Sequence, residues 1–138
     1  MSYLIKIEDT HLVESETESS ELIIIGSASF YGEDYKIRYR ETDEQFKNSF
    51  VTLSVENGNK VTMHRSGDYT TVMVMEKHKR HSCVYSTPAG SFTMGIYTDD
   101  VKSDMTPDGG TLTFRYTLDV NNNLISENIL KVTLKRKD

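Results

Sequence analysis

Two residues of opposite charge fall at positions where the surrounding sequence places apolar side chains. Arg65 follows Val61 and Met63 in one alternating phase, and Glu41 follows Tyr39 in another. An inward-facing charge is costly unless it is paired, so we expect Arg65 and Glu41 to pair near one rim of the fold. Such a pair either anchors the carboxylate or phosphate group of a ligand or only closes one end of the structure.

A second polar set occupies inward positions near the C-terminus. Ser126 and Asn128 are in phase with the apolar residue Leu124. A buried amide needs hydrogen-bond partners, and Tyr116 on the preceding strand can supply one. Asn128, Tyr116 and Tyr39 then either line a ligand cavity or belong to a satisfied internal network.

Sulfur and imidazole groups give weaker candidates. His78 and His81 have a spacing that can share a metal ion, but they lie in a charged turn without a third ligand nearby in the sequence. His81 and Cys83 share a strand face about 7 Å apart, too far for a base and its thiolate, so we expect a buried, inert cysteine. Methionines adapt to ligands of varied shape but also fill cores, and four of them fall on the central strands: Met63, Met73, Met75 and Met94.

Basic residues form an outward row on one predicted strand, at Lys36, Arg38 and Arg40. If the last strand pairs with an early one, further basic residues lie beside this row: Lys131, Lys135 and Arg115. Such a stripe can contact RNA, a phosphorylated ligand or an acidic partner. The alternative is a solvated face that protects the sheet from edge-to-edge aggregation.

Composition limits the classes of function. The 138 residues suit a single domain over 1–138, and 16 Lys and Arg against 21 Asp and Glu give a net charge of −5. That charge argues against generic binding to nucleic acid or to anionic membranes. One cysteine allows no internal disulfide, and no apolar run suits a signal peptide or a membrane span, so a cytoplasmic location is expected.

The elements that must position these residues are strands, because apolar residues alternate along the chain and turn residues recur at short intervals. The acidic segment Glu14–Glu21 is expected to be a mobile loop, and Thr42–Asn48 an irregular one. The predicted strands are Tyr3–Val13, Leu22–Tyr31, Tyr35–Glu41, Phe50–Glu56, Lys60–Arg65, Thr70–Glu76, His81–Ser86, Ser91–Thr98, Val101–Met105, Leu112–Val120 and Leu124–Lys135.

About ten strands joined by short loops require antiparallel neighbours. So many strands leave exposed edges unless the sheet closes. An all-β, antiparallel up-and-down barrel of about 8–10 strands fits this pattern, and its interior is either filled by side chains or holds one small ligand.

A series of short motifs, in order from about Leu22 to Leu134, resembles the YwiB-like family of small uncharacterised bacterial proteins. The resemblance implies a lipocalin-like (calycin) barrel but no activity, substrate or cofactor. The motifs are Tyr39-Arg40-Glu41, Val61-Thr62-Met63-His64-Arg65-Ser66-Gly67, Tyr85-Ser86-Thr87-Pro88-Ala89-Gly90, Met94-Gly95-Ile96-Tyr97-Thr98, Gly110-Thr111-Leu112 and Tyr116-Thr117-Leu118.

We therefore expect a non-enzymatic binding module without a cofactor, which holds a small amphipathic or anionic ligand in the barrel interior or at its rim. Its predicted binding residues are Arg65, Glu41, Tyr39, Tyr116 and Asn128. One alternative is a protein that acts through its surface, using the basic stripe or a homodimer interface formed by Leu22–Ile25. Another is a hydrolase or isomerase that uses His81, Cys83 or Glu41. The sequence contains no glycine-rich phosphate loop, nucleophile elbow or zinc spacing.

Overall fold

The computed structural model describes residues 2–41, 48–67, 70–87 and 90–137. These residues form ten strands: β1 (Ser2–Val13), β2 (Glu16–Tyr31), β3 (Asp34–Arg40), β4 (Phe50–Glu56), β5 (Lys60–Ser66), β6 (Thr71–Glu76), β7 (Arg80–Thr87), β8 (Gly90–Ser103), β9 (Gly109–Val120) and β10 (Asn123–Arg136).

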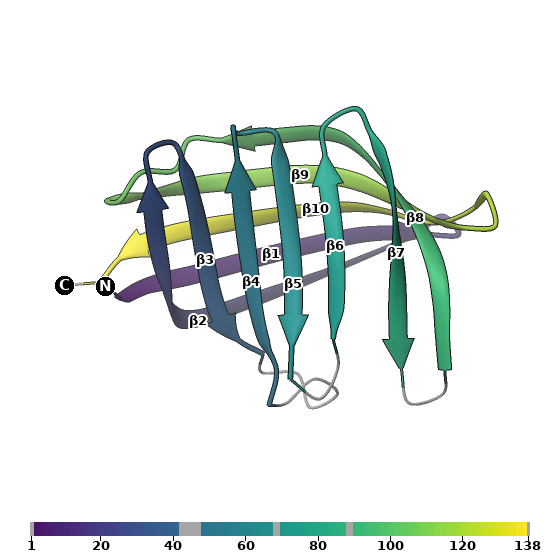
Figure 1. Cartoon of the computed structure of the whole chain (residues 1–138), viewed down its shortest axis with the longest axis horizontal. Coiled ribbons are helices and arrows are strands. Elements are labelled where there is room, and N and C mark those ends of the chain that lie inside the picture. The colour runs from purple at the N-terminus through teal and green to yellow at the C-terminus, as the bar shows by residue number, and fades with distance from the viewer. Residues whose placement is uncertain (1, 42–47, 68–69, 88–89, 138) are drawn as a thin grey trace.

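All ten strands belong to one antiparallel sheet in the order β6-β5-β4-β3-β2-β1-β10-β9-β8-β7. Strands that pair in the sheet are consecutive in the sequence, except for β1 and β10. Their pairing places the first and last strands of the chain side by side (Figure 1). The edge strands β6 and β7 are consecutive in the chain, and beside the turn that connects them Lys77 bridges Thr98 of β8. The result is a nearly closed up-and-down barrel, which confirms the predicted fold class.

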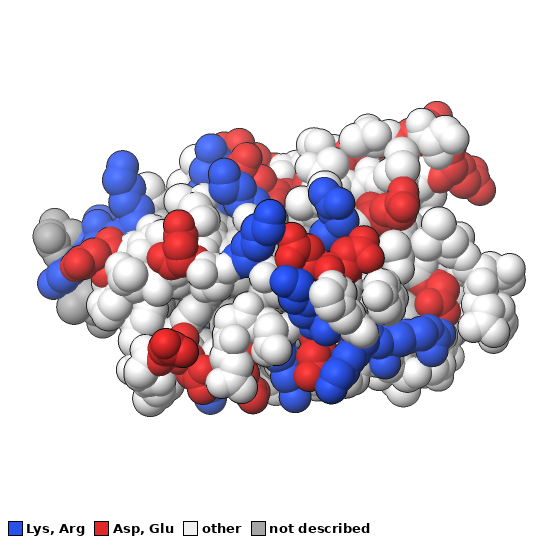
Figure 2. All heavy atoms as spheres, turned by 90° about the horizontal axis from the view of Figure 1, so that it is seen from above, with Lys and Arg blue, Asp and Glu red and all other residues white. Residues whose placement is uncertain are grey.

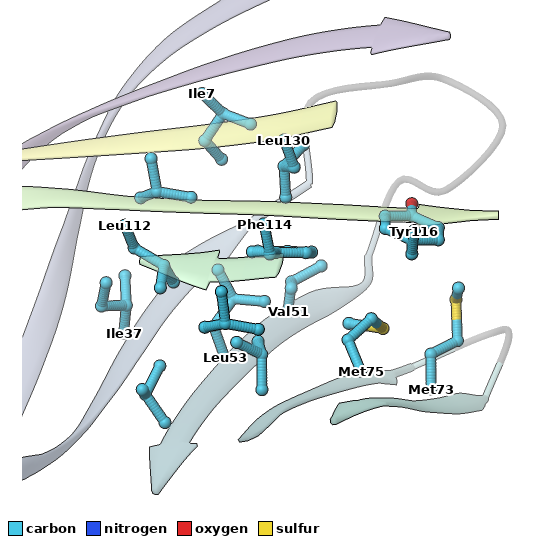
Figure 3. Close-up of a cluster of buried hydrophobic side chains, with 14 of the residues drawn as sticks. Ile7, Ile37, Val51, Leu53, Met73, Met75, Leu112, Phe114, Tyr116 and Leu130 are labelled. Carbon is cyan, nitrogen blue, oxygen red and sulfur yellow. The ribbon is translucent and has the colours of Figure 1, made fainter. Parts of the chain in front are cut away.

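Alternation along the strands produces the core. On β4, Val51, Leu53 and Val55 are fully buried, and on β3 the same is true of Ile37. Figure 3 shows Ile37, Val51 and Leu53 meeting side chains from β1, β6, β9 and β10 inside the barrel. Burying each such side chain contributes about 1.5–3 kcal/mol, so the interior away from the pocket described below is a packed core.

The acidic segment Glu14–Glu21 is not a loop, so that prediction was wrong. Only Glu14 and Ser15 form the turn, with φ values of 49° and 68°, and β2 begins at Glu16. The ladder from Glu8↔Glu21 to Val13↔Glu16 continues β1 and β2 as a hairpin. Backbone hydrogen bonds and a tight turn therefore maintain a strand whose side chains are exposed and polar.

Two β-bulges change the predicted phases. In β8 the register shifts between Thr98 and Asp100, so the two predicted strands Ser91–Thr98 and Val101–Met105 are one strand that ends at Ser103. In β10 the register shifts between Leu124 and Ser126. Leu124 is consequently exposed, whereas Ser126 and Asn128 face inward.

The predicted irregular segment Thr42–Asn48 lies almost wholly outside the described residues, as do parts of the predicted turns at residues 66–68 and 87–90. No helix in the described part of the chain is long and apolar enough to cross a membrane.

Candidate functional site

A pocket of about 680 Å³ opens at one end of the barrel. The β1–β2 and β9–β10 hairpins project at this end, opposite the chain termini (Figure 1). A smaller hollow of about 450 Å³ lies beside the β2–β3 turn and contains none of the predicted site residues. The larger pocket brings together all five of them: Tyr39, Glu41, Arg65, Tyr116 and Asn128.

The predicted ion pair between Arg65 and Glu41 forms at the pocket wall. Arg65 Nε and Nη2 donate hydrogen bonds of 3.2 and 2.9 Å, and both bonds end on Glu41 Oε1. The two side chains are only 16% and 12% exposed. Arg65 lies opposite Val51 in the β4–β5 ladder, so the alternation of β5 turns its side chain inward, while Glu41 directly follows β3. The guanidinium charge is therefore compensated within the protein.

Tyr39 and Tyr116 place two phenol groups on the pocket wall, although the residues are only 7% and 9% exposed. Burial raises the pKa of both phenols well above the usual value; nearby carboxylates add to the rise and Arg65 opposes it. Neither hydroxyl makes a hydrogen bond within the described part of the chain. In the described ranges, the side-chain atoms that are both fully enclosed and without a hydrogen-bond partner are Ser49 Oγ and Thr98 Oγ1. Neither phenol oxygen is therefore fully enclosed. The two phenol oxygens therefore reach the open space of the pocket.

Asn128 is buried beside Tyr116, its partner across the β9–β10 ladder. Its amide nitrogen donates to the Tyr116 carbonyl oxygen at 3.4 Å and to Ser126 Oγ at 3.0 Å. These bonds fix the orientation of the amide. Among the described residues no hydrogen bond uses its carbonyl oxygen, which can therefore accept one from a ligand. The residues of this hydrogen-bond network, Asn128, Tyr116 and Ser126, also line the pocket.

Sequence reasoning missed an acidic group on β1. Asp9 and His11 continue the inward phase of Ile7 and line the same pocket. His11 Nδ1 lies 3.4 Å from Asp9 Oδ1, and His11 Nε2 lies 3.9 Å from Glu18 Oε2. Burial raises the pKa of the Asp9 carboxyl, and the neighbouring His11 opposes that rise. The signal was present, because following the alternation of β1 beyond Ile7 places both residues inside.

Methionines cover the apolar part of the pocket. Met63, Met73 and Met94 line it, whereas Met75 is fully buried in the core. Figure 3 shows Met73 and Tyr116 together at one end of the core cluster. Met75 therefore fills the core, while Met73 and Met94 belong both to the core and to the pocket wall.

The histidine and cysteine candidates do not form a reactive group. His81 Nε2 lies 2.9 Å from Glu76 Oε1 on β6. Cys83 is buried, and burial raises the pKa of its thiol, which disfavours the thiolate needed for nucleophilic attack. Within the described ranges, no group of three or more His, Cys, Asp or Glu residues is arranged to hold a metal ion.

The predicted basic stripe is interrupted. Strands β1 and β2 separate β10 from β3, so Lys131 and Lys135 do not lie beside the row on β3. Lys131 pairs across the ladder with Glu8, which in turn pairs with Glu21. Charges of both signs are mixed over the face shown in Figure 2. This arrangement disfavours a continuous surface for RNA.

The predicted dimer segment Leu22–Ile25 forms part of β2. Ile23 and Ile25 point outward and are 57% and 51% exposed, while Leu22 and Ile24 pack toward the core. Leu4, the cross-strand partner of Ile25, is also exposed on this outer face.

The comparisons with known proteins agree with this fold. The family model described as "Domain of unknown function (DUF1934)" matches residues 5–132. The crystal structure of the ywiB protein from Bacillus subtilis superposes with a TM-score of 0.88 at 14% identity, and the match covers 99% of this chain and 92% of that one. No curated protein matches the sequence. The resemblance predicted from the motifs is confirmed, and at this identity the structural match establishes the fold alone.

Proposed function

This chain belongs to the family described as a domain of unknown function (DUF1934), and we propose that it is a non-enzymatic module that binds one small amphipathic molecule in the open pocket. The apolar part of the ligand packs against Met63, Met73 and Met94, and its polar end accepts or donates hydrogen bonds at Tyr39 and Tyr116. A pocket of about 680 Å³ lies within the range of about 300–1,000 Å³ usual for such sites.

The observation that carries the proposal is a difference between two pairs of inward-facing tyrosines. Toward the end where the chain termini lie, Tyr3 donates a hydrogen bond of 2.7 Å to the carbonyl oxygen of Pro107, and the Tyr35 hydroxyl lies 2.6 Å from Ser103 Oγ. Tyr39 and Tyr116, at the pocket, have no such partner in the described ranges. Their hydroxyls reach the open pocket instead, where a ligand can supply the hydrogen bonds that Pro107 and Ser103 supply to the first pair.

The experiment uses 2-phenylethanol as an uncharged amphipathic probe and follows the methyl signals of the methionines by NMR. Signals from Met63, Met73 and Met94 should shift on titration, while that of Met75 serves as an internal reference. Native mass spectrometry of the purified protein checks whether a ligand is already bound.

Paired tyrosine variants test the mechanism. Replacing Tyr39 and Tyr116 with Phe removes two hydroxyls worth about 0.5–1.5 kcal/mol each, so affinity should fall several-fold while the fold is kept. The matched control, Tyr3→Phe with Tyr35→Phe, should lower stability and leave affinity unchanged. A pocket that neither takes up the probe nor carries a ligand after purification would refute the proposal.

A second candidate is self-association through the outer face of β1 and β2, favoured by the exposed Leu4, Ile23 and Ile25. Neighbouring apolar side chains on a sheet face are typical of protein interfaces. Sedimentation velocity at several concentrations should then detect a dimer that the Ile23→Ser, Ile25→Ser variant abolishes, whereas a monomer at every concentration would exclude it.

A further inference from the structure

The charges around the pocket favour one class of ligand. We propose that the ligand carries an ammonium or guanidinium group, which the Asp9 carboxylate binds in the polar half of the pocket. This inference rests on the proposed binding function and adds the charge of the ligand, which the sequence analysis expected to be amphipathic or anionic.

The first argument is the balance of charge. Among the described residues that line the pocket, the acidic ones are Asp9, Glu21 and Glu41, and the basic ones are Arg65 and His11. Glu21 lies on the outer face beside Glu8, with its carboxylate 3.8 Å from Lys6 Nζ, so the inward-facing carboxylates are those of Asp9 and Glu41. Both hydrogen bonds between Arg65 and Glu41 end on the same carboxylate oxygen, so an anionic ligand would compete with Glu41 for the guanidinium. It would also approach the carboxylate of Asp9. A cationic ligand meets neither obstacle.

The second argument is the state of Asp9. Its carboxylate is 33% exposed, and the imidazole 3.4 Å away is its nearest ionisable partner among the described contacts. That imidazole also approaches Glu18, so two carboxylates share one histidine. A carboxylate that is partly buried and shares its imidazole neighbour with a second carboxylate binds a cation more strongly than an exposed carboxylate does.

The third argument is the register of three adjacent strands. In the β1–β10 ladder Asp9 pairs with Leu130 and His11 pairs with Asn128, so Asp9 and Asn128 are diagonal neighbours on one face. Asn128 pairs with Tyr116 across the next ladder. The register thus brings three acceptors onto adjacent strands: a carboxylate, an amide carbonyl oxygen and a phenol oxygen that has no partner in the described ranges. An ammonium group carries three N–H donors and suits this set.

The test compares three probes that share one apolar body: 2-phenylethylammonium, 2-phenylethanol and 3-phenylpropanoate. Affinities at neutral pH and low salt come from the same methionine methyl signals. We expect the ammonium probe to bind at least about tenfold more tightly than the carboxylate probe, with the alcohol in between. This ranking is measured on the unmodified chain and needs no variant.

Asp9→Asn then assigns the preference to one residue. The substitution keeps the shape of the side chain and should reduce the preference for the ammonium probe to within about twofold of the alcohol. The control is Glu8→Gln, which removes the same charge from the adjacent residue on the opposite face of β1 and should retain the full preference. Loss in both variants would mean that net charge alone attracts the cation, and it would overturn the assignment to Asp9.

The outcomes separate this inference from the proposed function. If the three probes bind equally, or if the carboxylate binds best, the cationic ligand is excluded and the binding function stands. If Asp9→Asn keeps the full preference, the role of Asp9 is excluded. If none of the three probes shifts a pocket methionine, both the inference and the proposed function are wrong.

Discussion

The Arg65–Glu41 pair allows a direct test of whether it closes the barrel or holds a ligand. We consider Arg65→Met, which keeps a linear apolar stem, Glu41→Gln, which keeps the shape of the side chain and removes its charge, and the double variant. If the pair is a structural part of the pocket wall, each single substitution should lower stability substantially, and the double variant should recover part of that loss.

The magnitude follows from burial. Exposed ion pairs contribute about 0–1 kcal/mol, whereas removing one partner of a buried pair costs about 3–5 kcal/mol, because the other charge is left uncompensated. With side chains 16% and 12% exposed, Arg65 and Glu41 are closer to the buried case. We therefore expect a loss of about 2–4 kcal/mol for each single variant and a coupling energy of about 2 kcal/mol in the double-mutant cycle.

Urea unfolding followed by far-UV circular dichroism gives these values, since the chain has no Trp and tyrosine fluorescence alone is weak. The control cycle uses Arg80 and Asp119, which make a two-point contact through bonds of 3.3 and 2.7 Å. Its geometry is better, but Arg80 is half exposed, so its coupling should be smaller. Single losses that simply add would refute the structural role of Arg65 and Glu41. A folded double variant that no longer binds 2-phenylethylammonium would show that the pair holds the ligand instead.

Three further predictions follow from burial and backbone geometry. Burial raises the pKa of Asp9 above its unfolded value of about 3.8, so the stability linked to this group is present at low pH and is lost as the pH rises through the folded pKa. Asp9→Asn should therefore be more stable than the unmodified chain at neutral pH, and the difference should shrink in acid. Urea unfolding curves recorded across the pH range measure this difference. Amides of residues 16–21 should be protected from hydrogen exchange, and Glu14→Asn with Ser15→Gly should raise the melting temperature; exchange at free-chain rates would contradict the hairpin. Cys83 should react slowly with a thiol reagent in the native state and fast in urea, and fast native labelling would contradict its burial.

Alternation was sufficient to predict the barrel, because a half-buried strand must place apolar residues at every second position. The strands that follow this rule closely, such as β3 and β4, were predicted almost to the residue. The first half of β2 was missed since its side chains are exposed on both faces, and its pairing depends on the backbone of β1, which a single segment cannot reveal. The bulges in β8 and β10 were also missed, because one inserted residue in a strand resembles a loop or an ordinary continuation.

The same rule predicted five residues of the pocket. Arg65, Glu41 and Asn128 were visible as polar residues in an apolar phase, and the ladder then placed them together. Asp9 was missed because the apolar residues of β1 end at Ile7 and the alternation was not followed beyond that point, although it places Asp9 inside. The sequences of β3 and β10 do not reveal that β1 and β2 lie between them, because the strand order depends on all the pairings in the sheet.

The two ends of the barrel differ in whether the protein supplies hydrogen-bond partners to inward-facing tyrosine hydroxyls. The hydroxyls of Tyr39 and Tyr116 reach the open pocket and gain no hydrogen bond from the described part of the protein, so Phe at either position would serve the fold equally well. The chain provides such partners for Tyr3 and Tyr35. Within the described ranges the hydroxyls of Tyr39 and Tyr116 have no such partner and face the pocket beside Asp9, and the proposed binding function rests on this difference. If Tyr39→Phe with Tyr116→Phe proved both more stable and equally able to bind all three phenylethyl probes, that argument would fail.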